Sequence, residues 1–180
     1  MKDFRIGIGY DVHRMAPERD LMLCTCHIPN ETGLDGHSDA DAPVHALIDA
    51  MFGALALGDI GQHYPDDDPQ YLGASGETLL RKTLALPEFQ GWRIGNLDIT
   101  IIAQKPKLAP YVPQMREALA KILGIGADHV SIKAKTAEGL DCAVEKRPEQ
   151  EMVRAAGAEN LQQDIRVQDD AGRRHVAVRR

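Results

Sequence analysis

The sequence predicts an α/β or α+β sandwich in which helices pack on one sheet. Stretches that alternate apolar and polar residues, typical of strands, are interspersed along the chain with stretches of helical repeat, and the first two strands are predicted to form a hairpin. The chain has 180 residues, a length that favours a single domain with a buried core of its own.

Residues 5–13, RIGIGYDVH, alternate between two faces and predict the first strand. We expect a polar loop at 14–20, a second strand at 21–28 and a turn at 29–33. One face of the first strand carries Ile6, Ile8, Tyr10 and Val12, and the other carries Arg5, Gly7, Gly9, Asp11 and His13.

Asp41 is predicted to cap a helix that has Pro43 in its first turn and ends near Gly58. A loop follows at 61–73, and Ser75 is predicted to cap a second helix over 75–86. Further elements are expected as a strand at 92–104, a loop at 106–113, a helix at 113–123 ended by Gly124, and a strand at 130–136.

The composition changes after residue 140. Only seven of the 39 residues in 142–180 are Val, Leu, Ile or Phe, a fraction typical of disordered segments. We therefore expect a folded domain over 1–141 and an atypical tail over 142–180, in which residues 175–178 are the one strand-like piece.

The formal net charge is -6, and scattered Lys and Arg residues disfavour a general nucleic-acid binder. No apolar run approaches the roughly 20 residues that a membrane helix needs, and the first residues enter a strand pattern without a leader, so a cytoplasmic protein is expected. Cys24 and Cys26 are interpreted as reduced, buried core residues rather than metal ligands.

Asp11 and His13 lie two apart on a strand, so both side chains leave the same face. His45, in the first turn of the next helix, is a possible third ligand, and two histidines with one aspartate are typical of a catalytic zinc site. Asp49, one helical turn later, is placed to orient His45. The alternative is a strand end beside a surface histidine.

Three other polar groups each allow two interpretations. Residues 37–41, HSDAD, are either a helix cap with solvated acids or a loop that presents a histidine and a hydroxyl to an anionic substrate. Asp66–Asp68 are favoured as a polar loop over a cation site. Two pairs of lysines at strand ends are either phosphate contacts or ordinary surface residues: Lys105, Lys107, Lys133 and Lys135.

Taken together, these segments resemble the 2-C-methyl-D-erythritol 2,4-cyclodiphosphate synthase family. The matching blocks run in the family's order over about residues 4–140: RIGIGYDVH, the HSDAD block with His45, GDIG, YPDDDP, NLDITIIAQKPKLAPYVPQMR and VSIKAKTAEGL. The resemblance implies a ferredoxin-like sandwich with an added β-hairpin, and a homotrimer with sites at subunit interfaces. It also implies conversion of 4-diphosphocytidyl-2-C-methyl-D-erythritol 2-phosphate to the cyclic diphosphate and CMP, in non-mevalonate isoprenoid synthesis.

The resemblance further implies Zn²⁺ on Asp11, His13 and His45, and a second cation, Mg²⁺ or Mn²⁺, on Glu138. His37 and Thr136 match the residues that stabilise the transition state. The loop 103–109 matches the cytidine loop of a neighbouring subunit. The implied substrate contacts are Asp11, Val12, His13, His37, Ser38, Asp59, Ile60, Gly61, Tyr64, Pro65, Asp66, Asp67, Asp68, Ala103, Gln104, Lys105, Pro106, Lys107, Leu108, Ala109, Lys135, Thr136, Ala137 and Glu138.

The chain departs from the family after Leu140. Where the family has a glycine-rich run, an arginine and an apolar last strand, residues 141–147 read DCAVEKR, so the last strand is expected to be missing or replaced. Three explanations compete: a frameshifted end, a replacement strand near 175–178, and a degenerate homologue that binds metal or nucleotide without efficient cyclisation. The abrupt change in composition favours the first. A generic metallophosphatase is a further alternative.

Overall fold

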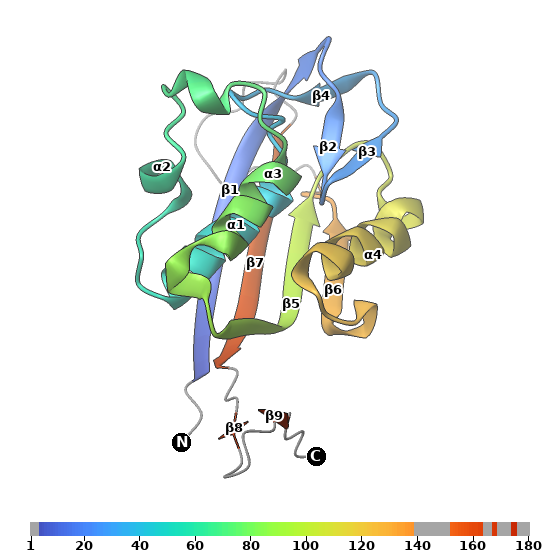
Figure 1. The fold of residues 1–180 in the computed structure, drawn as a ribbon. Coiled ribbons are helices and arrows are strands. Elements are labelled where there is room, and N and C mark those ends of the chain that lie inside the picture. The colour runs from blue at the N-terminus through green and yellow to red at the C-terminus, as the bar shows by residue number, and fades with distance from the viewer. Residues whose placement is uncertain (1–3, 139–151, 164–166, 169–173, 176–180) are drawn as a thin grey trace.

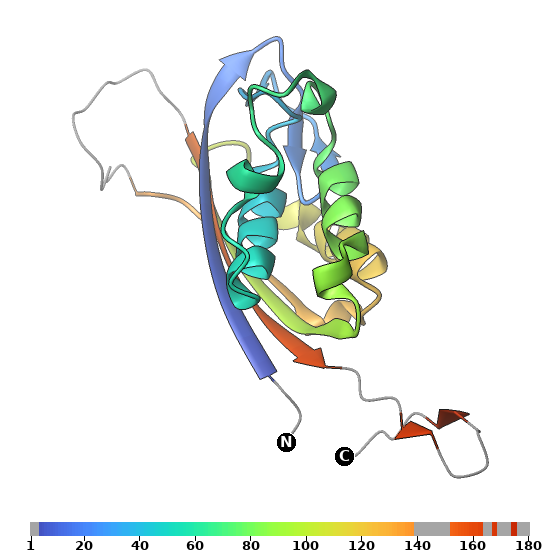
Figure 2. The same ribbon diagram turned by 60° about the vertical axis from the view of Figure 1, so that its left-hand side comes forward.

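The computed structural model describes residues 4–138 with their side chains and the backbone of 152–163, 167–168 and 174–175. A five-stranded sheet of order β4-β1-β7-β5-β6 carries the helices on one face (Figures 1 and 2), which confirms the predicted sandwich. The strands are β1 Phe4–Pro17, β4 Thr32–Leu34, β5 Trp92–Ile102, β6 Val130–Lys135 and β7 Met152–Gln163, and the helices are α1 Ala42–Ala54, α2 Ile60–His63, α3 Gly76–Ala85 and α4 Val112–Leu123.

The helix boundaries follow the predicted caps. The Asp41 side chain accepts a hydrogen bond from Val44 N at the start of α1, and Ser75 caps α3 in the same way. Gly124 ends α4 in the left-handed conformation that glycine adopts without strain. Helix α1 ends at Ala54, before the predicted stop at Gly58.

Strand β1 continues to Pro17, so the prediction of a polar loop at 14–20 is wrong for its first half. The reason is that β4 pairs antiparallel with this end, with Met15 opposite Leu34. A partner strand supplies backbone hydrogen bonds whatever the polarity of the side chains.

The two faces of β1 have opposite environments. Gly7 and Gly9 are buried against α1, where a Cβ on either residue would lie within 2 Å of a helix carbonyl oxygen. The apolar residues of the other face are exposed, most of all Ile8 at 79%. Among the described residues no helix covers this side of the sheet, as Figure 2 shows.

The predicted strand 21–28 is in fact a hairpin of β2 Leu21–Leu23 and β3 Cys26–Ile28. Its two turn residues, Cys24 and Thr25, have positive φ angles of 52° and 64°. The buried Asp41 carboxylate accepts hydrogen bonds from both backbone N–H groups of this turn, at 2.8 and 2.6 Å. Cys24 and Cys26 are buried and free, as expected.

Of the two expectations for the last strand, that it is missing or that it is replaced, the first is wrong. Strand β7 lies between β1 and β5 and runs antiparallel to both, with Gly157 opposite Gly9 and Ile99. A central strand is held by backbone hydrogen bonds on both sides, so its small and polar residues concealed it from a search for an apolar strand. The replacement is not near residue 175, where β9 (Arg174–His175) pairs with β8 (Val167–Gln168) in a separate small sheet. The proposed boundary near Asp141 lies outside the described residues.

The core fills the space between sheet and helices. Its largest fully buried side chains include Leu97, Ile99 and Ile101 of β5, and Leu47 and Phe52 of α1. No helix among the described residues has the length and apolar character needed to cross a membrane.

Candidate active site

Three predicted metal ligands come together where β1 meets α1. The Asp11 carboxylate oxygen Oδ2 lies 3.0 Å from His13 Nε2 and 3.1 Å from His45 Nδ1, and the two ring nitrogens are 3.3 Å apart. Two imidazole nitrogens and one carboxylate that converge in this way are the donor set of a three-ligand zinc site. The chemistry of these residues therefore fits a divalent metal.

The other ring nitrogen of each histidine has a partner as well. His13 Nδ1 lies 2.7 Å from the carbonyl oxygen of Asp35, which only accepts, so Nδ1 carries a proton, and in the neutral imidazole Nε2 is the nitrogen available to a metal. His45 Nε2 lies 3.2 Å from the hydroxyl of Ser38. Such contacts orient metal-binding histidines in general.

Asp11 and His13 shift each other's pKa. Burial raises the pKa of Asp11, but hydrogen bonds and charge from His13 and His45 outweigh burial and hold this pKa well below its usual range. Burial lowers the pKa of His13, but Asp11 and the Asp35 carbonyl outweigh it and raise the pKa. The carboxylate is thus ionised at neutral pH, as a metal ligand must be.

A cavity of about 380 Å³ opens beside the cluster. Its walls come from β1, the start of α1, the segment after Asp59 and α3. The lining residues are Asp11, His13, Gly36, His37, Ser38, His45, Ile60, Gly61, Tyr64, Pro65, Asp66, Tyr71 and Leu79.

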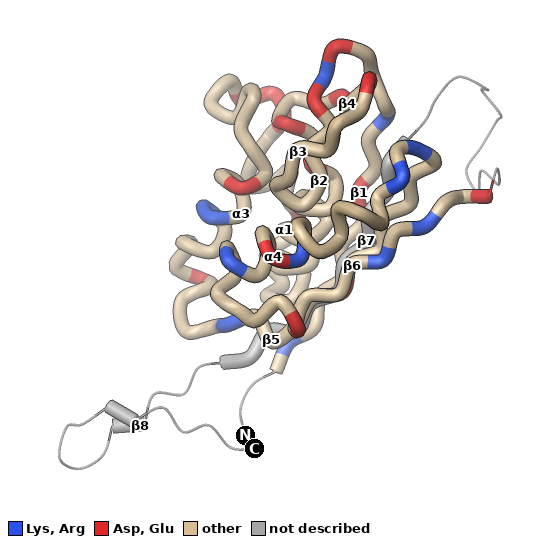
Figure 3. Tube along the Cα trace, turned by 90° about the vertical axis from the view of Figure 1, so that its right-hand side faces the viewer, with Lys and Arg blue, Asp and Glu red and all other residues tan. Residues whose placement is uncertain are grey.

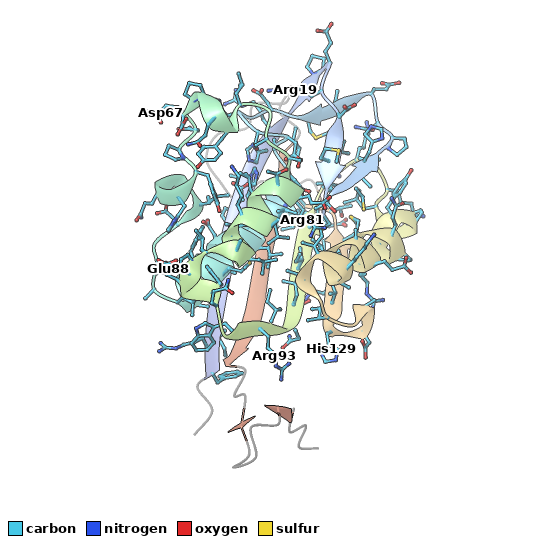
Figure 4. All side chains as sticks on the ribbon, viewed as in Figure 1. Arg19, Asp67, Arg81, Glu88, Arg93 and His129 are labelled. Atoms are coloured by element: carbon cyan, nitrogen blue, oxygen red, sulfur yellow. The ribbon has the colours of Figure 1, made fainter. Side chains whose placement is uncertain are left out.

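The cavity includes many of the expected substrate contacts. His37 and Ser38 lie on its wall, and His37 Nε2 donates to the carbonyl oxygen of Asp68 at 3.2 Å. Asp66 also lines it, but Asp59, Asp67 and Asp68 do not. The Asp59 side chain caps α2, the Asp68 side chain accepts from Gln70 N, and Asp67 is exposed at the edge of its loop (Figure 4).

Sequence reasoning missed Gly36, Tyr71 and Leu79 as cavity residues. The Tyr71 ring packs edge-on against Tyr64 at 5.2 Å. The Tyr64 hydroxyl lies 3.0 Å from the buried hydroxyl of Thr83, which itself donates to Leu79 O. Tyr71 stands close after the YPDDDP block, which was the available signal, whereas Leu79 has only the pattern of a core helix residue.

The prediction that Asp49 orients His45 is wrong. Asp49 Oδ1 accepts a hydrogen bond from Ile60 N at 2.7 Å and so fastens the start of α2 to α1. Burial raises the pKa of Asp49, and the hydrogen bond from Ile60 opposes this rise. Asp49 therefore supports the cavity wall at Ile60 rather than the metal ligand.

Val12 lies on the exposed face of β1, and the expected contacts at 103–109 and 135–138 form a second group that does not line this cavity. Ala103 N donates to Lys135 O at 3.0 Å, and the Thr136 hydroxyl contacts the Glu138 carboxylate, so the loop 103–109 adjoins the end of β6. None of these residues lines the cavity within one chain. Basic residues follow β6 and the neighbouring loop (Figure 3), and one of them, Lys133, is paired with Asp98.

Comparison with known proteins agrees with this arrangement. Residues 4–156 match the sequence profile of the YgbB family. The chain belongs to the YgbB family. This confirms the resemblance expected from the motifs, because relatives that match over most of the chain bear the name 2-C-methyl-D-erythritol 2,4-cyclodiphosphate synthase.

Two curated YgbB relatives bear the name 2-C-methyl-D-erythritol 2,4-cyclodiphosphate synthase. The protein of Brachyspira hyodysenteriae is 56% identical over 137 residues, which cover 76% of this chain and 87% of the relative. The protein of Thermosynechococcus vestitus is 51% identical over 140 residues, 78% of this chain and 87% of the relative. A solved synthase structure with bound CDP has a TM-score of 0.77 and 35% identity, and the match covers 87% of this chain and 99% of that one.

Proposed function

We propose that this protein is a cyclising phosphorus–oxygen lyase that forms 2-C-methyl-D-erythritol 2,4-cyclodiphosphate and CMP from the diphosphocytidyl 2-phosphate. It would serve non-mevalonate isoprenoid synthesis in the cytoplasm. The observation that carries the proposal is the meeting of Asp11, His13 and His45 at a cavity lined by His37 and Ser38. The family membership and the relatives' names support it.

Asp11, His13 and His45 would hold Zn²⁺, and Glu138 would contribute to a second site for Mg²⁺ or Mn²⁺. Bound zinc supplies Lewis-acid polarisation of a phosphate group and a fixed point for orienting it. A highly anionic substrate on a protein of net charge -6 needs such local positive charge.

The protein's own residues would orient the substrate and shield it from water. His37 is held by the Asp68 carbonyl, so its ring stands at a fixed place on the cavity wall next to Ser38. We assign these two residues to the reacting phosphates. The polyol part would lie along Ile60, Gly61 and Tyr64, where ring and backbone atoms exclude water from the reacting groups.

A homotrimer is part of the proposal, for two reasons. The exposed face of β1 forms a continuous apolar row, and such patches mark interaction surfaces. The group at 103–109 and 135–138 does not line the cavity of its own chain, so a neighbouring copy is the natural source of the cytidine and second-cation contacts. The apolar row consists of Phe4, Ile6, Ile8, Tyr10 and Val12, between 39% and 79% exposed.

The decisive experiment measures CMP release from the diphosphocytidyl substrate by the purified full-length chain. One CMP per cyclic diphosphate is expected, with about one zinc per chain. Changing His13 to Ala should abolish zinc retention and turnover. His129→Ala is the matched control, since His129 is exposed and contacts Gly95 O at the far end of the sheet (Figure 4).

Two outcomes would overturn the proposal. Release of inorganic phosphate without a cyclic product would indicate a metallophosphatase. Zinc binding without CMP release would indicate a degenerate homologue. Light scattering after size exclusion tests the trimer separately, and Ile8→Glu should shift the mass toward that of a single chain because it places a charge in the apolar row.

A further inference from the structure

His13 depends on one backbone carbonyl for its orientation. Its Nδ1 donates to Asp35 O at 2.7 Å, and this contact directs Nε2 toward Asp11 and His45. If the carbonyl shifted, the imidazole would lose both its tautomer preference and its direction. The position of the Asp35–Gly36 segment is therefore part of the metal centre.

One arginine holds this segment. Arg19 Nη2 donates to Gly36 O at 2.6 Å and to the Asp35 carboxylate at 3.2 Å. Within the part of the chain that the structure describes, the Asp35 backbone has one further hydrogen bond, from Asp35 N to Arg14 O. Arg19 thus contacts both residues of the peptide unit whose carbonyl oxygen accepts the hydrogen bond from His13.

The segment is also tightly enclosed. A Cβ on Gly36 would lie 3.1 Å from Cε1 and 3.2 Å from Nδ1 of His13, so the ring rests directly on this residue. A Cβ on Gly33 would lie 2.2 Å from Asp20 O and 2.4 Å from Arg19 O. With contacts this close, a displacement of the segment is passed on to the imidazole.

We propose that Arg19 is a positioning residue of the metal centre, which acts on His13 through Asp35 and Gly36. The inference rests on the proposed metal site, and it adds a residue outside the expected ligand and substrate set. Arg19 touches none of the three ligand side chains. Both of its charge-assisted hydrogen bonds come from one guanidinium nitrogen, Nη2, so loss of this group removes both contacts at once.

An ordinary surface ion pair would behave differently. The side chains of Arg19 and Asp35 are 43% and 51% exposed, and exposed pairs contribute little to global stability. Removal of Arg19 should therefore leave the unfolding temperature nearly unchanged while it weakens metal binding. If Arg19 had only a structural role, its removal would lower both the unfolding temperature and the zinc affinity, or neither of them.

The test compares Arg19→Met with Arg81→Met in the full-length protein. Arg81 is similarly exposed, at 54%, and pairs with Glu77 on α3 (Figure 4), so its loss removes a comparable ion pair from a helix that carries none of the three ligands. Zinc affinity is measured by competition with a chromophoric chelator, and the apo unfolding temperature is measured alongside. We expect zinc affinity about tenfold weaker in Arg19→Met, within the range found for outer contacts of metal ligands, and unchanged in Arg81→Met.

The Co²⁺ absorption spectrum gives a second measure, since its visible bands respond to ligand geometry and should change in Arg19→Met alone. Wild-type zinc affinity in a folded Arg19→Met protein would overturn the inference and leave the proposed function standing. If Arg19→Met does not fold, Arg19→Ala is decisive by the same criterion. Absence of zinc binding in the unaltered protein would instead refute the metal centre, and this inference with it.

Discussion

The carbonyl oxygen of Ala46 lies 1.9 Å from the point where a Cβ on Gly9 would stand, so β1 and α1 meet backbone to backbone. Gly9 precedes Asp11 by two residues and Ala46 follows His45 directly. Changing Gly9 to Ala should force the strand and helix apart, at a cost of about 1–3 kcal/mol typical of overpacking. We expect lower stability and weaker zinc binding, measured by denaturant unfolding and chelator competition.

Gly53→Ala is the matched control for this change. A Cβ on Gly53 would meet its nearest neighbour, Ile8 O, at 3.9 Å, an ordinary contact, and the residue lies inside α1. Alanine should therefore stabilise the protein by about 0.5–1 kcal/mol. Equal effects of the two substitutions would contradict the close approach at Gly9.

The turn at Cys24 and Thr25 is strained, because both residues have positive φ and neither is glycine. Thr25→Gly should raise the free energy of unfolding by about 1 kcal/mol. A left-handed conformation costs an L-residue roughly 1–2 kcal/mol, and the larger conformational entropy of glycine in the unfolded chain offsets part of the gain from removing this cost. Thr100→Gly, in the middle of β5, should lower it. Denaturant titration at one pH measures both, and a loss of stability in Thr25→Gly would refute the strain.

Tyr64 and Thr83 should act as a unit. Because the Thr83 hydroxyl donates to Leu79 O, it accepts from Tyr64, and this bond holds an aromatic wall of the cavity. Thr83→Val should raise KM several-fold with a small change in kcat and cost about 1 kcal/mol of stability. Tyr64→Phe should behave alike, and the double variant should be no worse than either. Fully additive effects in steady-state assays would show that the bond does not position Tyr64.

The buried Asp41 carboxyl group should give the stability of the protein an unusual dependence on pH. Burial and the nearby Asp39 charge raise its pKa to about 6, above the roughly 3.9 of an unfolded chain. The folded state therefore binds this proton more readily, so the Asp41 contribution to stability grows as pH falls from 7 toward 5. Relative to Asp41→Asn, which cannot titrate, the unaltered protein should gain about 1 kcal/mol over this range. A constant difference between the two proteins in unfolding at pH 7 and pH 5 would contradict the raised pKa.

Strand β7 predicts which C-terminal truncations the fold tolerates. A chain that ends at residue 151 lacks the strand between β1 and β5 and should lose cooperative thermal unfolding. A chain that ends at residue 163 keeps the five-stranded sheet and should melt cooperatively. Cooperative melting of the shorter chain would show that β7 is dispensable.

The origin of residues 142–180 is a separate prediction. The change in composition suggested a frameshift near codon 141, although β7 supplies a strand after this point. If the frameshift occurred, one of the two other reading frames should encode a glycine-rich, apolar strand. Sequencing the coding DNA tests this directly. If neither of the other frames encodes such a strand, the frameshift is ruled out.

Local patterns predicted most elements of the fold because their signals lie within a few residues. The caps at Asp41 and Ser75 and the stop at Gly124 each satisfy backbone groups nearby in the chain. The hairpin at 21–28 escaped prediction because its turn has no glycine and is held by Asp41, 16 residues away from Thr25. Likewise, β7 is defined by its two partner strands rather than by its own residues.

For the candidate site, strand alternation alone placed Asp11 and His13 on one face and made them possible ligands. The motifs then identified the family and with it most of the cavity residues. Asp11 and His13 meet His45, 32 residues after His13, because Gly9 lets β1 contact α1 closely. The roles of Asp49 and Arg19 could be seen only in the folded structure. The periodicity of apolar residues follows from the backbone geometry of helices and strands, so it can be recognised in the sequence. Which distant backbone a side chain reaches depends on packing, and that was decided by the tertiary structure.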